Sequence, residues 1–155
     1  GEPMKTKTKN KAQDFTLVLS TDKSPKQVFE AVTDVRGWWS AKLVGNSRKK
    51  NDVFEFRYED MHYSKQRLVE VVANKKVVWQ VMDSTLTFLK KDQNEWNGTK
   101  VSFEISQNGE KTQLLFTHHG LVPGIECFEA CSEGWNHYLR NSLLRLINTG
   151  KGKPD

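Results

Sequence analysis

The sequence predicts an α+β domain in which a curved antiparallel β-sheet wraps around one long C-terminal helix, with short helices after the first strand. Between residues 41 and 117, apolar and polar side chains alternate, which is the period of half-buried strands. From residue 128 onward, apolar side chains recur every three or four positions, which is the period of one helix face. A sheet that buries one face against a single helix leaves space that is hard to fill, so we also expect a cavity.

The first strand and the first helix have recognisable boundaries. Residues 15–19 alternate loosely between apolar and polar side chains and predict a strand. Ser24 suits the N-cap of a helix and Pro25 suits its first turn, which predicts a short helix over residues 26–33. Gly37 follows this helix, and two tryptophans stand directly after it.

The middle of the chain contains the most regular strand pattern. Residues 53–58 place Phe54, Phe56 and Tyr58 on one face, with charged side chains on the other. Residues 76–83 are apolar on both faces. A strand with two apolar faces is covered on both sides, so we expect this one at the centre of the sheet.

Further strands follow, and turn residues separate them. Residues 63–72 predict a strand that a turn joins to the central one. Residues 101–106 and 112–117 alternate on either side of Asn108-Gly109. This dipeptide favours the tight turns that match strand twist, so the two segments are predicted to form a hairpin.

The last predicted element is a helix of about two dozen residues. Phe128, Trp135 and Leu139 lie on its apolar face, and its final turns are strongly apolar. Gly150 is predicted to end it, because glycine readily adopts the left-handed conformation found after helices.

The charge of +5 is unevenly distributed. Residues 1–11 hold four lysines against one glutamate, and we expect them to be a disordered basic arm or a cloning remnant. Residues 12–155, expected to form a single domain, carry 20 basic and 18 acidic side chains. Such a balanced body does not favour a dedicated nucleic-acid surface. There is no run of apolar residues long enough to span a membrane.

The two cysteines, Cys127 and Cys131, are four residues apart on the predicted helix. A disulfide framework normally joins distant segments, and a bridge between helical neighbours gains little. We therefore expect two free thiols, a reducing compartment and a cytoplasmic location.

Several segments together resemble the family related to the activator of the heat-shock 90 ATPase. This family belongs to the START-like, or Bet v 1-like, helix-grip superfamily, also called SRPBCC. The resemblance spans roughly residues 14 to 154, and it depends on the order and spacing of its parts rather than on any single motif. The segments that carry it are residues 24–33, Gly37-Trp38-Trp39, 85–88, 96–103, 112–121, 134–143 and 150–154.

The resemblance implies an antiparallel sheet that grips the C-terminal helix around a cavity. It does not imply one activity, because relatives with this fold bind hydrophobic small molecules, carry polyketide cyclase-type chemistry, sequester reactive compounds or stimulate a chaperone. It supplies no shared catalytic motif, so no catalytic residue is assigned.

Aromatic side chains are the first candidates for a ligand site, because they offer large apolar surfaces and can stack on a flat ligand. Plain core packing is the alternative for each of them. Five tryptophans in 155 residues favour a pocket for the set as a whole. The candidate lining residues are Trp38, Trp39, Phe54, Phe56, Tyr63, Trp79, Phe103, Phe116, His118, Trp135 and Tyr138.

His118 and His119 end the last predicted strand, so their side chains point to opposite faces. A histidine inside an apolar pocket could move a proton near neutral pH, whereas a hydrogen-bonded histidine at a strand end is the simpler alternative. Cys131 and His137 are six apart on one helix and lie on different faces, which excludes a nucleophile–base pair.

Metal and cofactor sites are not expected. The residues His118, His119, Cys127, Cys131 and His137 lack the spacing of standard zinc ligands. No glycine-rich phosphate loop or nucleophile elbow is present.

The leading hypothesis is a protein that binds a hydrophobic or aromatic small molecule in an internal cavity. Because no catalytic motif is evident, we favour a binding protein over an enzyme. A regulator of the heat-shock 90 ATPase is the first alternative, although such a regulator would be expected to have a further N-terminal domain. A polyketide cyclase-like enzyme is the second. The expected partners are the small molecule and, for the first alternative, the chaperone. We expect a monomer or weak homodimer.

Overall fold

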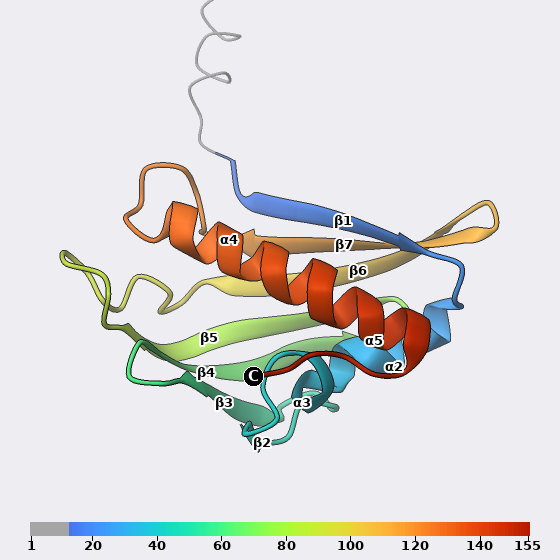
Figure 1. Ribbon diagram of the computed structural model, residues 1–155, viewed down its shortest axis with the longest axis horizontal. Helices are drawn as coiled ribbons and strands as arrows, with labels where there is room; N and C mark the ends of the chain where they lie inside the picture. Colours follow the sequence, from blue (N-terminus) through green and yellow to red (C-terminus); the bar gives the residue numbers. More distant parts are fainter. Residues whose placement is uncertain (1–12) are drawn as a thin grey trace, which may run out of the picture.

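Seven antiparallel strands form one curved sheet in the order β1-β7-β6-β5-β4-β3-β2 (Figure 1). The computed structural model describes residues 13–155, so the predicted arm over residues 1–11 lies outside the described residues. The strands are β1 (Phe15–Thr21), β2 (Val44–Gly45), β3 (Val53–Tyr58), β4 (His62–Val72), β5 (Lys76–Leu86), β6 (Lys100–Asn108) and β7 (Lys111–His119). Strand β5 has three strands on either side, which confirms its predicted central place.

Helix α2 (Pro25–Thr33) begins as its sequence predicts. The backbone N–H of Gln27 donates to Ser24 Oγ at 3.2 Å, and the Gln27 side chain accepts from the backbone N–H of Ser24 at 3.0 Å. This reciprocal capping box satisfies donors that the first turn of a helix leaves free. A four-residue helix, α3 (Val35–Trp38), follows, which confirms more than one short helix after the first strand. The position of α3 was not predicted, because so short a turn shows no periodicity.

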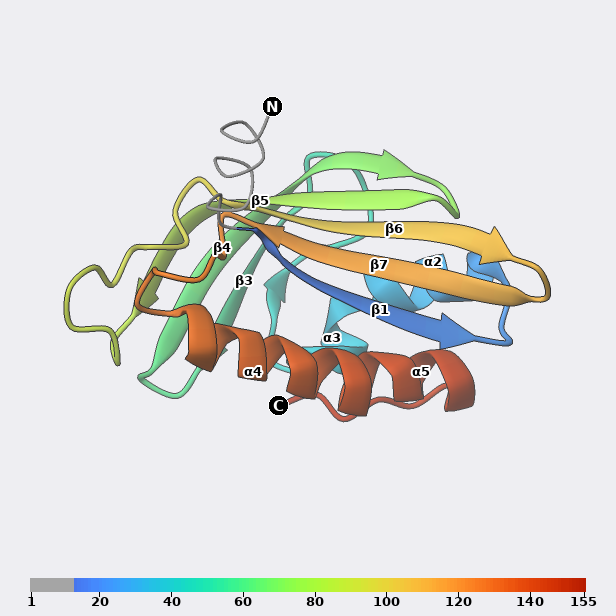
Figure 2. The ribbon, with the colours of Figure 1, turned by 90° about the horizontal axis from the view of Figure 1, so that it is seen from above.

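The C-terminal helix lies across the concave face of the sheet (Figures 1 and 2). It consists of α4 (Phe128–Tyr138), a π-helical turn η1 (Leu139–Leu143) and α5 (Leu144–Thr149), which confirms one long helical segment. In the π turn, the buried Ser142 hydroxyl donates to the Trp38 carbonyl oxygen at 2.7 Å. Gly150 ends the helix with φ 83°, the left-handed conformation that glycine adopts without steric cost.

Aromatic rings occupy most of the space between the sheet and the C-terminal helix. Trp38, Trp39 and Trp79 are fully or almost fully buried. Their rings lie nearly parallel, with centroids 5.6 to 6.2 Å apart and interplanar angles of 12° to 15°. Such close packing of large side chains leaves the centre of the domain filled. The empty space lies toward one end of the sheet.

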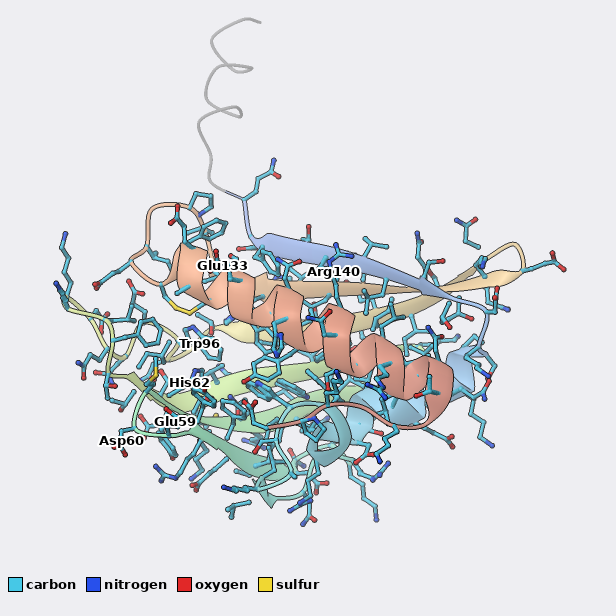
Figure 3. The ribbon with its side chains drawn as sticks, in the orientation of Figure 1. Glu59, Asp60, His62, Trp96, Glu133 and Arg140 are labelled. Atoms are coloured by element: carbon cyan, nitrogen blue, oxygen red, sulfur yellow. A yellow bond between two sulfur atoms is a disulfide. The ribbon has the colours of Figure 1, made fainter. Side chains whose placement is uncertain are left out.

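Cys127 and Cys131 form a disulfide, drawn as a yellow bond at the start of α4 in Figure 3. The expectation of two free thiols is therefore wrong. Cys127 directly precedes α4 and already has helical backbone angles, φ −75° and ψ −12°. One helical turn then places the two Cα atoms 5.5 Å apart, within the range that a disulfide spans. The prediction of a reducing compartment rested on two free thiols, so the structure does not support it.

Within residues 13–155, no helix combines the length and the apolar character needed to cross a membrane.

Candidate functional site

A pocket of about 370 Å³ opens at the end of the sheet where the β3–β4 turn, the β5–β6 connection and the start of α4 meet. Three of its lining residues, Tyr58, Met61 and Phe88, are 37 to 43% exposed, and we call them the mouth residues. Ala130 on α4 is also exposed. The remaining lining residues form the deeper walls, and they are Trp39, Phe56, His62, Trp96, Cys131, Gly134, Trp135 and Tyr138.

Most of the deeper wall surface consists of aromatic rings that pack against other aromatic rings. Phe56 stacks on Trp39 with centroids 4.0 Å apart and an interplanar angle of 14°. Trp96 lies parallel to Trp135, with centroids 5.8 Å apart. The rings of His62 and Trp96 are nearly perpendicular, with centroids 4.7 Å apart. Because each of these rings is supported by neighbours, the walls of the pocket are formed before a ligand binds.

The buried His118 positions two of these walls. The indole N–H of Trp135 donates to His118 Nδ1 at 3.0 Å, so the proton of the neutral imidazole is on Nε2. Nε2 donates to Thr99 Oγ1 at 2.9 Å, and the Thr99 hydroxyl donates to the carbonyl oxygen of Trp96 at 2.6 Å. Burial, and to a smaller extent His119, lowers the pKa of His118 to about 3. At neutral pH both of its nitrogens are therefore engaged and the ring is uncharged.

His62 lies in the pocket wall beside a buried polar group. Its Nε2 is 2.9 Å from the hydroxyl of Ser64, which accepts a hydrogen bond from Gln66 Nε2 at 2.6 Å. Since that hydroxyl already accepts from Gln66, its own proton is available for His62 Nε2. Burial lowers the pKa of His62 to about 3, so this wall is also neutral at pH 7.

Asp155 ties two pocket walls together. Its backbone N–H donates to the Trp39 carbonyl oxygen at 3.1 Å, and its backbone oxygen accepts from Ala41 N–H at 2.9 Å. The Tyr138 hydroxyl donates to the Asp155 carboxylate. Burial, together with this hydrogen bond, raises the pKa of Tyr138, which keeps the phenol protonated.

The structure divides the eleven predicted lining residues among three places. Trp39, Phe56, Trp135 and Tyr138 line the pocket. Tyr63 lies on the opposite face of the sheet, where the Arg57 guanidinium is 4.3 Å from the centre of its ring. The other six are buried in the core and do not line the pocket: Trp38, Phe54, Trp79, Phe103, Phe116 and His118.

Other lining residues carried little signal in the sequence. Trp96 stands in a polar stretch that suggests a surface loop, yet it is only 4% exposed. Gly134 faces open space, because a Cβ atom placed there meets no atom within 4 Å. Met61 lies in the β3–β4 turn, where strand periodicity does not apply. Figure 3 shows His62 and Trp96 beside each other at this end of the molecule.

Comparison with known families places most of the chain in one of them. The family model described as "Activator of Hsp90 ATPase homolog 1-like protein" matches residues 22–148. No curated protein sequence matches the chain significantly.

Solved structures share the fold. The Aha1 dimer from Colwellia psychrerythraea has a TM-score of 0.72 at 21% identity, over 90% of this chain and 99% of that one. The Mll3558 protein from Rhizobium loti has a TM-score of 0.66 at 19% identity, over 88% of this chain and 97% of that one. DynU16, a putative protein in the dynemicin biosynthetic locus, has a TM-score of 0.66 at 18% identity over 90% of this chain, which spans 48% of DynU16. At these identities the likeness concerns the fold alone.

Proposed function

This chain belongs to the Activator of Hsp90 ATPase homolog 1-like family, and from that premise we propose that it binds a hydrophobic or aromatic small molecule in the pocket between β3, β4 and α4. The observation that carries the proposal is the pocket itself. Its volume of about 370 Å³ is within the range of small-molecule sites. Its walls are almost entirely aromatic or aliphatic, and its single titratable imidazole, His62, is neutral at pH 7.

The same geometry favours binding over catalysis. A general base needs a free lone pair within reach of the substrate. His118 accepts from Trp135 through one nitrogen and donates to Thr99 through the other, so it has no free lone pair. His119 is exposed, and its Nε2 lies 2.9 Å from Ser102 Oγ. Neither histidine supports the cyclase-like alternative.

Gly134→Leu tests the proposal without removing any wall. The new side chain would extend into the open space beside Gly134 and fill part of the pocket. Leucine also favours the helix over glycine by about 0.8 kcal/mol, so the variant should fold at least as well. We expect the affinity for the neutral fluorescent probe N-phenyl-1-naphthylamine to fall by roughly tenfold or more, because the space it needs is taken.

Gly134→Ala is the matched control. It gains the same helix stabilisation but adds one methyl group, so the probe should still bind with a stoichiometry near one. Native mass spectrometry of the purified protein beside its denatured mass would show whether a molecule is already captured. Equal probe binding by both variants, or none by the parent protein, would count against the pocket as the binding site.

Regulation of the heat-shock 90 ATPase is a second candidate, supported by the family match. The relative from Colwellia psychrerythraea is described as an Aha1 dimer, and this chain spans 99% of it. A chaperone ATPase assay with and without the protein tests the regulation, and an unchanged rate would count against it. Sedimentation analysis tests whether this chain also forms a homodimer. A cytoplasmic location stays a prediction.

A further inference from the structure

We infer that the pocket selects arylalkyl ammonium ions, in which a flat apolar ring enters the pocket and a positively charged nitrogen stays at its mouth. This inference rests on the proposed function and names the class of ligand. It is carried by three observations: the charges around the mouth, the free ring faces of Tyr58 and Phe88 at the mouth, and the absence of a cationic side chain among the described residues that line the pocket.

Negative charge gathers around the mouth, although the described chain as a whole is weakly basic. The three segments that surround the opening are residues 57–62, 87–99 and 120–138. Their basic side chains are Arg57, Lys90 and Lys91, and their carboxylates are Glu59, Asp60, Asp92, Glu95, Glu126, Glu129 and Glu133. In the view of Figure 3, Glu59 and Asp60 lie next to His62.

Two of these carboxylates are available to a ligand. Glu59 and Asp60 are exposed in the turn between two mouth residues, Tyr58 and Met61. Among residues 13–155, the side chains of these two make no hydrogen bond or ion pair. Arg57, by contrast, lies over the ring of Tyr63 on the opposite face of the sheet and pairs with Glu55 at 3.8 Å.

The mouth is also held in place relative to the pocket. The Thr87 hydroxyl donates to the carbonyl oxygen of Asp60 at 2.7 Å, and Thr87 N–H donates to the Met61 carbonyl oxygen at 3.0 Å. These bonds join the β3–β4 turn to the segment that carries Phe88. The negative turn and the aromatic mouth therefore form one connected rim.

The rings of the mouth differ from those of the deeper walls. Within the described part of the chain, Tyr58 and Phe88 stack against no other aromatic ring, whereas Trp39, Phe56 and Trp96 each contact several. An unstacked ring face carries negative quadrupole density and attracts a cation. A ligand nitrogen at the mouth would thus meet aromatic faces and nearby carboxylates together.

An anionic ligand would meet the opposite situation. Within residues 13–155, neither Lys nor Arg lines the pocket, and the one imidazole in its lining, His62, is buried and uncharged at pH 7. A carboxylate placed inside would lose its hydration without gaining a positive partner. A carboxylate left at the mouth would stand among like charges.

Three matched compounds test the inference by isothermal titration calorimetry: 1-naphthylmethylammonium, 1-naphthylmethanol and 1-naphthylacetate. They share a ring and differ in charge. At low ionic strength we expect the cation to bind about tenfold more tightly than the anion, with the alcohol between them. The ratio should shrink when ionic strength rises from about 0.01 M to about 1 M, because salt screens exposed charges.

The double variant Glu59→Gln/Asp60→Asn should lower the cation-to-anion ratio by about threefold, since it removes two charges from the rim. The matched control is Glu104→Gln/Glu110→Gln, which changes net charge equally near the β6–β7 hairpin, at the far end of the sheet (Figure 1). It should leave the ratio unchanged. Thermal melting of both variants checks that each is folded.

The outcomes separate the two proposals. If the alcohol binds, and the acetate binds as tightly as the ammonium ion or more tightly, the charge selection is wrong. The proposed function of the pocket then still stands. The same holds if the rim and control variants change the ratio equally. If none of the three compounds binds, the proposed function fails and the selection fails with it.

Discussion

The indole N–H of Trp135 on α4 donates a hydrogen bond to Nδ1 of His118 on β7, with 3.0 Å between the nitrogens. This bond joins the C-terminal helix to the sheet inside the core. It continues through Thr99 to the backbone of Trp96, so one buried imidazole positions two pocket tryptophans. In this structure both ring nitrogens of His118 are hydrogen-bonded, and the ring holds these two walls of the pocket in place.

Replacing His118 should destabilise the fold. His118→Leu leaves the Trp135 N–H without an acceptor in a buried site, which costs about 1 to 3 kcal/mol in the free energy of unfolding. Urea denaturation measures this loss. His119→Leu is the control, because His119 is exposed and should change stability by only about 0.5 kcal/mol. Equal losses for the two variants would show that the buried network contributes nothing specific.

The free energy of unfolding should decrease as the pH is lowered from neutral to mildly acidic values. Burial lowers the pKa values of both His62 and His118 to about 3, whereas the pKa of a histidine in the unfolded chain is near 6.5. Above pH 6.5 both states are neutral and the histidines add no pH dependence. Below it the unfolded chain binds protons that the folded chain does not, so stability is lost progressively as pH falls toward 3. Each histidine contributes a slope approaching about 1.4 kcal/mol per pH unit.

Urea denaturation at pH 7, 6 and 5 would measure this slope above the range in which most carboxylates titrate. In His118→Leu the slope should fall to about half, because only one buried histidine remains. A flat profile in the parent protein would mean that the two rings become protonated in the folded state near their ordinary pKa.

The sequence predicted the fold well because the decisive signals were local. The two apolar faces of β5 indicated a central strand, and Asn108-Gly109 indicated a tight hairpin. The stop at Gly150 depended on the backbone preference of one residue. Each inference needed only spacing or a single conformational preference, which a sequence shows directly.

The pocket was harder to foresee, for a geometric reason. Strand periodicity identifies the inward face but not how far along the strand the core stops being filled. Phe54 and Phe56 share the inward face of β3, yet only Phe56 reaches the pocket. Trp96 is buried because Thr99 and α4 hold it there, and these are contacts between segments that sequence spacing does not reveal.

The same substitution should have opposite effects at two glycines. Gly134→Ala should stabilise the protein by about 1 kcal/mol, since it favours the helix and its methyl group meets open space. At Gly152 a Cβ would collide with the carbonyl oxygen of Gly37 and press on that of Ser142. Gly152→Ala should therefore displace the final segment and weaken the Asp155 contacts to Trp39 and Tyr138. Thermal melting compares the two, and a stabilising Gly152→Ala would contradict the packing described.

The disulfide between Cys127 and Cys131 makes a prediction that a thiol count can check. Unfolded, unreduced protein should show no reactive thiol, and reduction should expose two. Because the bridge closes a loop of only about five residues, its reduction should lower the free energy of unfolding by about 2 kcal/mol at most, less than for a long loop. The double variant Cys127→Ser/Cys131→Ser is the control, because added reductant should leave its stability unchanged. Two reactive thiols before reduction would instead restore the free cysteines expected from the spacing, and with them the argument for a reducing compartment.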